Sequence, residues 1–187
     1  MAGRLAMGLL AAAVLQTAVL GWMIRGHWVD LTTGTEVVLE TTMVDPRDFF
    51  RGHYVTLRLN IQQVDRAKLA PVDQLEQGKP LFALLQKGEG AYWEVASLST
   101  KTPDKGPFLK SKTKFRTFMV SDENTRKTVG IQLPFTRYYA PKKQAQELEK
   151  LRNAGKMGII VSVLPDGRGK IKGVSLDGVL VYDESLF

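Results

Sequence analysis

The feature that most limits what this chain can fold into is an apolar segment near its N-terminus. Residues 5–24 read LAMGLLAAAVLQTAVLGWMI and contain no charged side chain. As a helix this segment rises about 30 Å, which matches the hydrocarbon core of a bilayer. A helix packed on a soluble core keeps a polar stripe, and this segment has none. The sequence therefore predicts a transmembrane helix.

Two interpretations of this segment stay open. Its length and the interfacial residue types Trp22, Arg25 and Trp28 favour a retained anchor. The alternative is a cleaved signal peptide, although a cut after Ala18 puts Gln16 where a small residue is required. We expect the retained anchor.

The anchor divides the chain into a short N-terminus (1–4), the transmembrane segment (5–24) and one body (26–187). A short N-terminal stretch before a first helix usually stays inside, so we expect the body on the outer side of the membrane. The chain has no cysteine, which excludes disulfides, thiolate catalysis and cysteine-ligated metals. Its net charge of +7 permits an anionic partner without requiring one.

Small residues recur at four-residue spacing inside the anchor. Such a stripe lets a second helix approach closely, although alanine-rich spans also produce it by chance. The helix-contact candidates are Ala13, Thr17 and Gly21.

The body reads as a series of short strands. A strand is expected at 36–44, and apolar residues alternate with polar ones from Val55 to Ile61. Turn residues then join apolar runs into three candidate hairpins and lead to a last strand. The expected pairs are 79–86 with 91–98, 115–120 with 128–135, and 157–164 with 170–174, and the last strand is 176–182.

One helix is expected in the body, near 141–154. Pro141 suits a first helical turn, and Leu148 and Leu151 follow at helical spacing. Many short strands with one helix predict a mainly β fold, a β-rich α+β domain with antiparallel sheets behind the transmembrane helix.

Residues 45–59 read DPRDFFRGHYVTLRL, in which Pro46 ends one strand and Gly52 precedes the next. This segment resembles the signature of the GDYXXLXY family of bacterial membrane-anchored proteins. His53 replaces the Asp of that signature, and Leu59 replaces its last Tyr. Segments 134–150 and 163–179 are similar to the aromatic-then-helix segment and the closing hairpin of the family. The matching signature positions are Gly52, Tyr54 and Leu57.

The resemblance implies a single-pass protein of the bacterial inner membrane with an extracytoplasmic, periplasmic domain, and it supplies no established reaction. Members of the family often occur beside genes for multi-pass membrane proteins. The leading hypothesis is therefore a non-enzymatic accessory or interaction subunit of a membrane-protein complex, with the lipid bilayer and a multi-pass protein as partners. No cofactor is expected.

The signature segment has two open readings. Turn chemistry that fixes strand register explains most of its residue types. The other reading is a ligand or partner surface, on which Tyr54 and Arg58 would share one strand face. The candidate residues are Asp45, Arg47, Asp48, Arg51, Gly52, His53, Tyr54, Leu57 and Arg58.

A basic stretch follows between residues 101 and 116. Lysines at alternate positions of an extended segment protect a sheet edge from aggregation, which requires no ligand. The alternative is a binding site for anionic lipid or an acidic envelope polymer; nucleic acid is not expected for an exported domain. The anion-binding candidates are Lys101, Lys105, Lys110, Lys112, Lys114 and Arg116.

The sequence gives little support for an enzyme active site or a metal site. The layout of an anchor and an outer β-rich domain is similar to that of bacterial signal peptidases, but no serine precedes Ser97. Thr41 or Thr42 would need a base such as Lys110 or Lys114 to act as nucleophile, which leaves a cryptic hydrolase as a less favoured reading. His53 with nearby carboxylates forms no recognisable metal motif, so no metal site is predicted.

Overall fold

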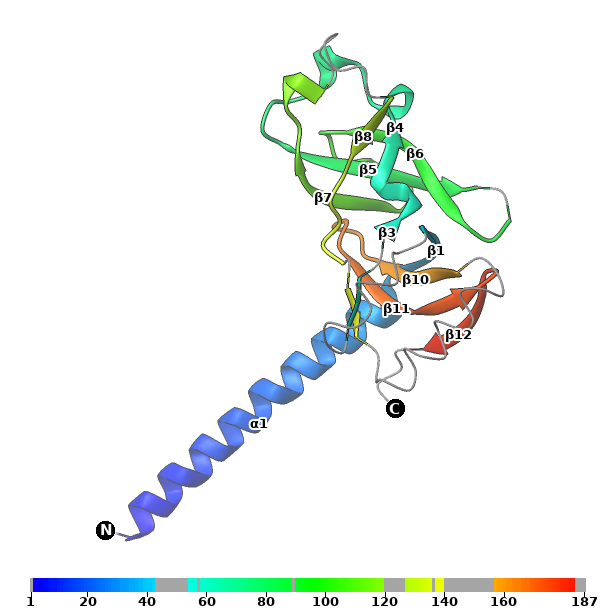
Figure 1. Cartoon of the computed structure of the whole chain (residues 1–187). Coiled ribbons are helices and arrows are strands. Elements are labelled where there is room, and N and C mark those ends of the chain that lie inside the picture. The colour runs from blue at the N-terminus through cyan, green and yellow to red at the C-terminus, as the bar shows by residue number, and fades with distance from the viewer. Residues whose placement is uncertain are drawn as a thin grey trace.

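A long helix followed by antiparallel sheets makes up the computed structural model of this chain (Figure 1). The structure describes residues 2–42, 54–56, 58–88, 90–119, 127–135, 137–139 and 157–183. Helix α1 (Ala2–Thr33) continues past Ile24, where the expected span ended. It stops at Gly34, which leads directly into the first strand. The expected helix near 141–154 lies outside the described residues.

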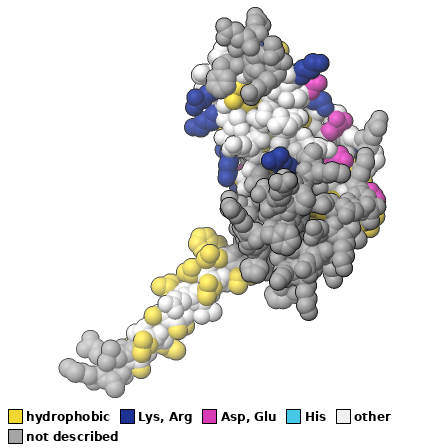
Figure 2. All heavy atoms as spheres, viewed as in Figure 1, with side chains coloured by type: hydrophobic (Ala, Val, Ile, Leu, Met, Phe, Trp, Pro, Cys, Tyr) yellow, Lys and Arg dark blue, Asp and Glu magenta, His cyan; other side chains and the backbone are white. Residues whose placement is uncertain are grey.

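Helix α1 exposes apolar side chains along most of its length. The candidate membrane span, Ala6–Thr33, has none of its apolar window buried against the rest of the chain. Met7, Leu15 and Trp22 are all exposed, and Figure 2 shows hydrophobic side chains along the projecting helix. Water is a poor solvent for such a surface, so the helix has the character of a membrane anchor or a signal sequence.

A five-stranded antiparallel sheet lies beside the C-terminal end of α1 (Figure 1). Its strand order is β12-β11-β10-β1-β3, so the N-terminal strand β1 pairs with β10 from the C-terminal region. The strands are β1 (Thr35–Thr42), β3 (Arg58–Leu59), β10 (Met157–Val163), β11 (Gly169–Leu176) and β12 (Val179–Asp183).

A three-stranded sheet of order β6-β5-β7 and two short strand pairs, β2–β9 and β4–β8, complete the described sheets. Figure 1 shows the three-stranded sheet beyond the five-stranded one as seen from α1. The strands are β2 (Tyr54–Thr56), β4 (Gln63–Asp65), β5 (Pro80–Lys87), β6 (Trp93–Ser99), β7 (Phe108–Lys114), β8 (Thr128–Gly130) and β9 (Arg137–Tyr139). Short 3-10 helices are η2 (Asn60–Gln62), η3 (Arg66–Lys68), η4 (Val72–Gln74) and η5 (Thr117–Met119).

One hydrophobic core joins the two larger sheets. Val37 and Leu39 of β1, Leu81 of β5 and Leu109 of β7 belong to the same buried cluster. Each buried aliphatic side chain of this size contributes about 1.5–3 kcal/mol to folding. The two sheets therefore stabilise each other as parts of one domain.

The structure confirms the β-rich antiparallel class, together with the β5–β6 and β10–β11 hairpins. Gly90 and Gly167, in the connections of these hairpins, have φ values of +77° and +81°, which glycine adopts without strain. The last strand begins at Val179, because Leu176 still belongs to β11 and the pair 177–178 forms the turn.

Two strand predictions were wrong. Segment 128–130 pairs with β4 instead of forming a hairpin with residues 115–120, where a 3-10 turn begins at Thr117. The alternating run ending at Ile61 is also not one strand, since η2 bends the chain at Asn60. Leu59 and Ile61 are both buried although the chain bends between them. Because the apolar alternation continues through the bend, it did not reveal where the strand ends.

Candidate functional site

The described part of the family signature lies in two separate strands. Tyr54 is in β2, opposite Tyr139 of β9. Arg58 is in β3, opposite Thr42 of β1, and is exposed. Tyr54 and Arg58 therefore pair with different strands, and their shared strand face stays a prediction. The pairing of β2 with β9 does place the signature beside the aromatic segment that follows residue 134.

The remaining signature candidates lie outside the described residues, so their roles stay predictions. They are Asp45, Arg47, Asp48, Arg51, Gly52, His53 and Leu57.

The basic stretch places its lysines on one exposed face of β7. Lys110, Lys112 and Lys114 are exposed, while Leu109 and Ser111, on either side of Lys110, are buried. Lys101 and Lys105 are exposed in the preceding loop, and Arg116 is exposed just after the strand. Figure 2, viewed as Figure 1, shows Lys and Arg side chains gathered on the side where β7 lies.

The backbone of β7 is not left open on the side away from β5. Lys112 N donates to Gln132 O at 2.7 Å, and Lys110 N donates to Gly167 O at 2.8 Å. These bonds occupy donors that an aggregating strand would otherwise use. Protection of an unpaired strand edge against aggregation therefore does not fully explain the three exposed lysines of β7.

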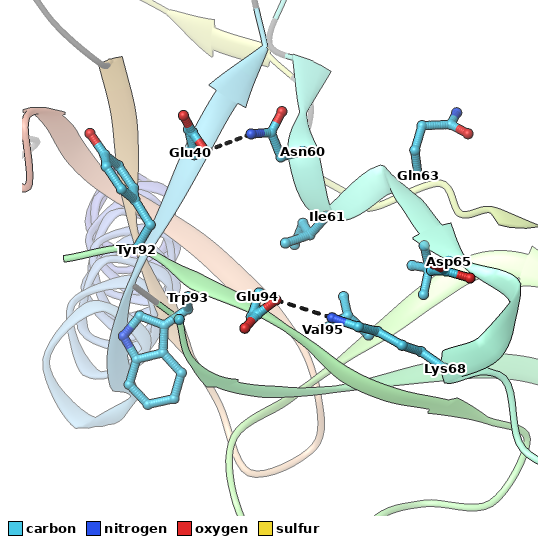
Figure 3. Close-up of a pocket in the computed structure, with 12 residues that line it drawn as sticks. Glu40, Asn60, Ile61, Gln63, Asp65, Lys68, Tyr92, Trp93, Glu94 and Val95 are labelled. Atoms are coloured by element: carbon cyan, nitrogen blue, oxygen red, sulfur yellow. Dashed lines mark hydrogen bonds and ion pairs between the residues drawn. The ribbon is translucent and has the colours of Figure 1, made fainter. Parts of the chain in front are cut away.

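A cleft of about 630 Å³ opens where β1, η2, β4 and β6 meet (Figure 3). Carboxylates, amides and one lysine surround an apolar floor that includes Ile61 and Val95. The polar lining residues are Glu40, Asn60, Gln63, Asp65, Lys68, Tyr92 and Glu94. This mixture of donors and acceptors suits recognition of a polar ligand or a partner segment.

Two hydrogen-bonded pairs order the cleft (Figure 3). Asn60 Nδ2 donates to Glu40 Oε2 at 2.6 Å, and Lys68 Nζ donates to Glu94 Oε2 at 3.0 Å. The hydrogen bond from Lys68, followed by one from Gln86, lowers the pKa of Glu94. Burial, and then the charges of Asp177 and Glu40, raise the pKa of Tyr92. At neutral pH the cleft therefore holds an ionised Glu94 and a protonated Tyr92 hydroxyl.

The cleft was not predicted from the sequence. Its lining comes from residues 40, 60–68 and 88–95, which only the pairing of the sheets brings together. The run Tyr92-Trp93-Glu94 directly after a predicted turn was the one local signal, because aromatic and charged residues beside a turn are often exposed for recognition.

A second group of polar residues joins α1 to the five-stranded sheet. The buried Ser162 hydroxyl donates to Asp30 O at 2.7 Å. Lys170 Nζ lies 3.2 Å from Asp30 Oδ2 and 2.9 Å from His27 Nδ1. Arg168 Nη1 lies 3.5 Å from the same Asp30 carboxylate. We call Asp30, Ser162, Arg168 and Lys170 the helix junction.

The Arg168 side chain also binds Asp166, with Nε 2.6 Å from Oδ2. This hydrogen bond lowers the pKa of Asp166 and raises that of Arg168. A charged residue at the end of an apolar helix, here Asp30, was the sequence signal for the junction. Its partners lie more than 130 positions away, so no local pattern identified them.

The helix-contact candidates remain on an open surface. Ala13, Thr17 and Gly21 are all exposed, and nothing lies within 4 Å of a Cβ built on Gly21. The Thr17 hydroxyl donates to Ala13 O at 2.9 Å within the same helix, so it is compatible with an apolar environment. The stripe is sterically accessible to a second helix.

Among the described residues, no group of three His, Asp or Glu side chains is placed to hold a metal ion. Of the two suggested threonine nucleophiles, Thr41 has its described side-chain contact with a backbone carbonyl and not with a lysine. Thr41 Oγ1 donates to Met157 O at 2.7 Å, as part of the β1–β10 region. Lys110 and Lys114 lie on the exposed face of β7 in the other sheet.

Comparisons with known proteins identify a family. A family model described as "GDYXXLXY protein" matches residues 16–174, which cover most of the chain. No curated protein and no solved structure matches. The match begins within α1 and ends in β11, so it includes the second half of the helix, the signature, the three-stranded sheet and most of the five-stranded sheet. The chain belongs to the GDYXXLXY family.

Proposed function

We propose that this protein is a single-pass accessory subunit of a membrane-protein complex, with its β-rich domain in the bacterial periplasm and no catalytic activity of its own. The observation that carries the proposal is α1, whose apolar side chains are exposed along the span and which continues without a break into the domain. Contact with a bilayer or with another membrane helix removes that apolar surface from water. The position of family members beside genes for multi-pass proteins supports a partner of that type.

The direct connection of α1 to the five-stranded sheet supports the role of an accessory subunit. The helix junction fixes the direction in which the domain leaves the membrane, since Ser162 and Lys170 both bind Asp30. A domain held in this way presents the same surfaces to a neighbouring subunit at all times. The cleft and the basic face of β7 are the surfaces available for periplasmic contacts.

Co-purification tests this proposal. Full-length protein, tagged and expressed at its native level, should retain a stoichiometric multi-pass protein after extraction in mild detergent. Gly21→Leu should lower that retention about fivefold, because it fills the small-residue stripe. Gly8→Leu is the matched control, since it adds the same side chain on a different face and also meets open space. Recovery of the chain without any multi-pass protein would reject the proposal.

The basic face of β7 supports a second candidate function, the binding of an acidic envelope polymer. Lys110, Lys112 and Lys114 are exposed at alternate positions of the strand. A row of cations complements a repeating polyanion better than it complements a single small anion.

Charge reversal tests the second candidate. The triple variant K110E/K112E/K114E should lose at least tenfold in affinity for an acidic polysaccharide at physiological salt, because three attractive contacts become repulsive. Wild-type protein should bind more weakly as salt rises. Unchanged binding by the variant would exclude this face, and a preference for anionic vesicles over the polymer would assign the face to lipid.

A further inference from the structure

The helix junction lies close to the expected membrane surface. Arg4 and Arg25 bracket the uncharged residues 5–24, which limits how far the helix can slide through a bilayer. With a rise of 1.5 Å per residue, His27 and Asp30 lie roughly 4.5 and 9 Å beyond the hydrocarbon edge at Ile24. The polar headgroup layer is about 5–7 Å thick on each side. His27 is therefore at headgroup level, and Asp30 lies just outside this layer.

Side chains of the β10–β11 hairpin reach the same level. Lys170 Nζ is within 3.2 Å of both His27 Nδ1 and Asp30 Oδ2. Arg168 contacts Asp30, and its side chain is 59% exposed. The domain thus does not stand clear of the bilayer. It brings Lys170 to headgroup level, and Arg168 lies just outside that level, beside the point where α1 leaves the membrane.

The charges of this surface are balanced. Arg168 and Lys170 are accompanied by Asp30 and Asp166, which gives two cations and two carboxylates. A cluster without net charge has little long-range attraction for an anionic lipid. It complements a group that carries both a phosphate and a hydrogen-bonding ammonium.

We propose that the helix junction, together with Asp166, binds the headgroups of zwitterionic phospholipids that carry a primary ammonium, the phosphatidylethanolamine type. Arg168 and Lys170 donate hydrogen bonds to the phosphate. Arginine and lysine have five and three N–H donors, which is more than the described contacts use. The exposed Asp166 carboxylate accepts from the ammonium, an interaction that a fully methylated ammonium cannot make through N–H donors. This inference rests on the membrane anchor of the proposed function.

Lipid retention by full-length protein tests the inference. The protein is placed in nanodiscs that contain equal amounts of phosphatidylethanolamine, phosphatidylcholine and phosphatidylglycerol, and retained lipids are counted by native mass spectrometry. Wild-type protein should retain phosphatidylethanolamine about fivefold over phosphatidylcholine. The variant R168Q/K170Q should retain several-fold less of both phosphatidylethanolamine and phosphatidylcholine, because both lipids carry the phosphate to which these side chains donate.

Three further variants distinguish a loss of lipid binding from a loss of folding. D166N preserves the turn, in which Arg168 N binds the Asp166 side chain at 3.0 Å, but it should remove the preference for phosphatidylethanolamine. R168K/K170R should retain it. K87Q/K127Q changes two exposed lysines, one at the end of β5 and one just before β8, and should behave as wild type.

Equal retention of all three lipids by wild type would overturn the inference, as would an unchanged preference in D166N together with unchanged retention by R168Q/K170Q. Dominant retention of phosphatidylglycerol would also overturn it. These results would leave the anchor intact. Failure of the full-length chain to enter nanodiscs would instead reject the anchor, and with it this inference.

Discussion

Replacing Leu39 with alanine is expected to lower the free energy of unfolding by about 2–5 kcal/mol. Leu39 is 0% exposed and lies in β1, opposite Ile159 of β10. Strand β1 also contacts β6 of the three-stranded sheet. The cavity left by the missing methyl groups would be surrounded by two sheets, whose hydrogen bonds prevent them from closing around it.

Leu180→Ala is the matched control for this prediction. Leu180 is 47% exposed in β12, so its truncation should cost less than about 1 kcal/mol. Both variants can be compared with wild type in detergent by denaturant unfolding followed through tryptophan fluorescence, because Trp93 packs against the core. Equal losses for the two variants would show that β1 does not join the sheets.

Gly34→Ala is expected to destabilise the protein by about 1–3 kcal/mol through overpacking. A Cβ on Gly34 would lie 2.1 Å from Ser162 Oγ and 3.0 Å from Val163 O. The Ser162 hydroxyl is committed to Asp30 O, and the other neighbour is backbone of β10, so neither can move cheaply. Because the φ of Gly34 is outside the left-handed region, space rather than conformation requires glycine here.

Gly26→Ala is the matched control, with the opposite sign. Nothing lies within 4 Å of a Cβ on Gly26, and alanine stabilises a helix relative to glycine by up to about 1 kcal/mol. Thermal unfolding in detergent should therefore shift down for Gly34→Ala and remain equal or shift up for Gly26→Ala.

The double variant G34A/S162A gives a sharper check. Ser162→Ala alone removes the hydrogen bond to Asp30, but it also removes the oxygen that a new Cβ would meet. The two substitutions should therefore be less destabilising together than the sum of their separate effects. Additive losses would place the cost of Gly34→Ala somewhere other than the contact with Ser162.

The basic face of β7 and the cleft differ in how far each could be predicted from the sequence. The alternation of Lys110, Lys112 and Lys114 predicted a shared side, and the structure places them on one exposed face. A period of two follows from the geometry of one strand, so it needs no knowledge of the partner strand. The cleft gave no such signal, because Glu40, Asn60 and Glu94 belong to three elements that meet only after folding.

The sequence by itself determined the apolar helix, the antiparallel β-rich class and the two hairpins with glycine turns. Each depends on neighbours within a few residues: side-chain hydrophobicity over one span, or a residue that tolerates positive φ at Gly90 and Gly167. Tertiary structure decided the pairing of β1 with β10, the meeting of β2 with β9, and the attachment of α1 through Asp30 and Ser162. Those contacts join residues 80 or more positions apart. Their selection depends on which buried faces fit together, a property that no single segment carries.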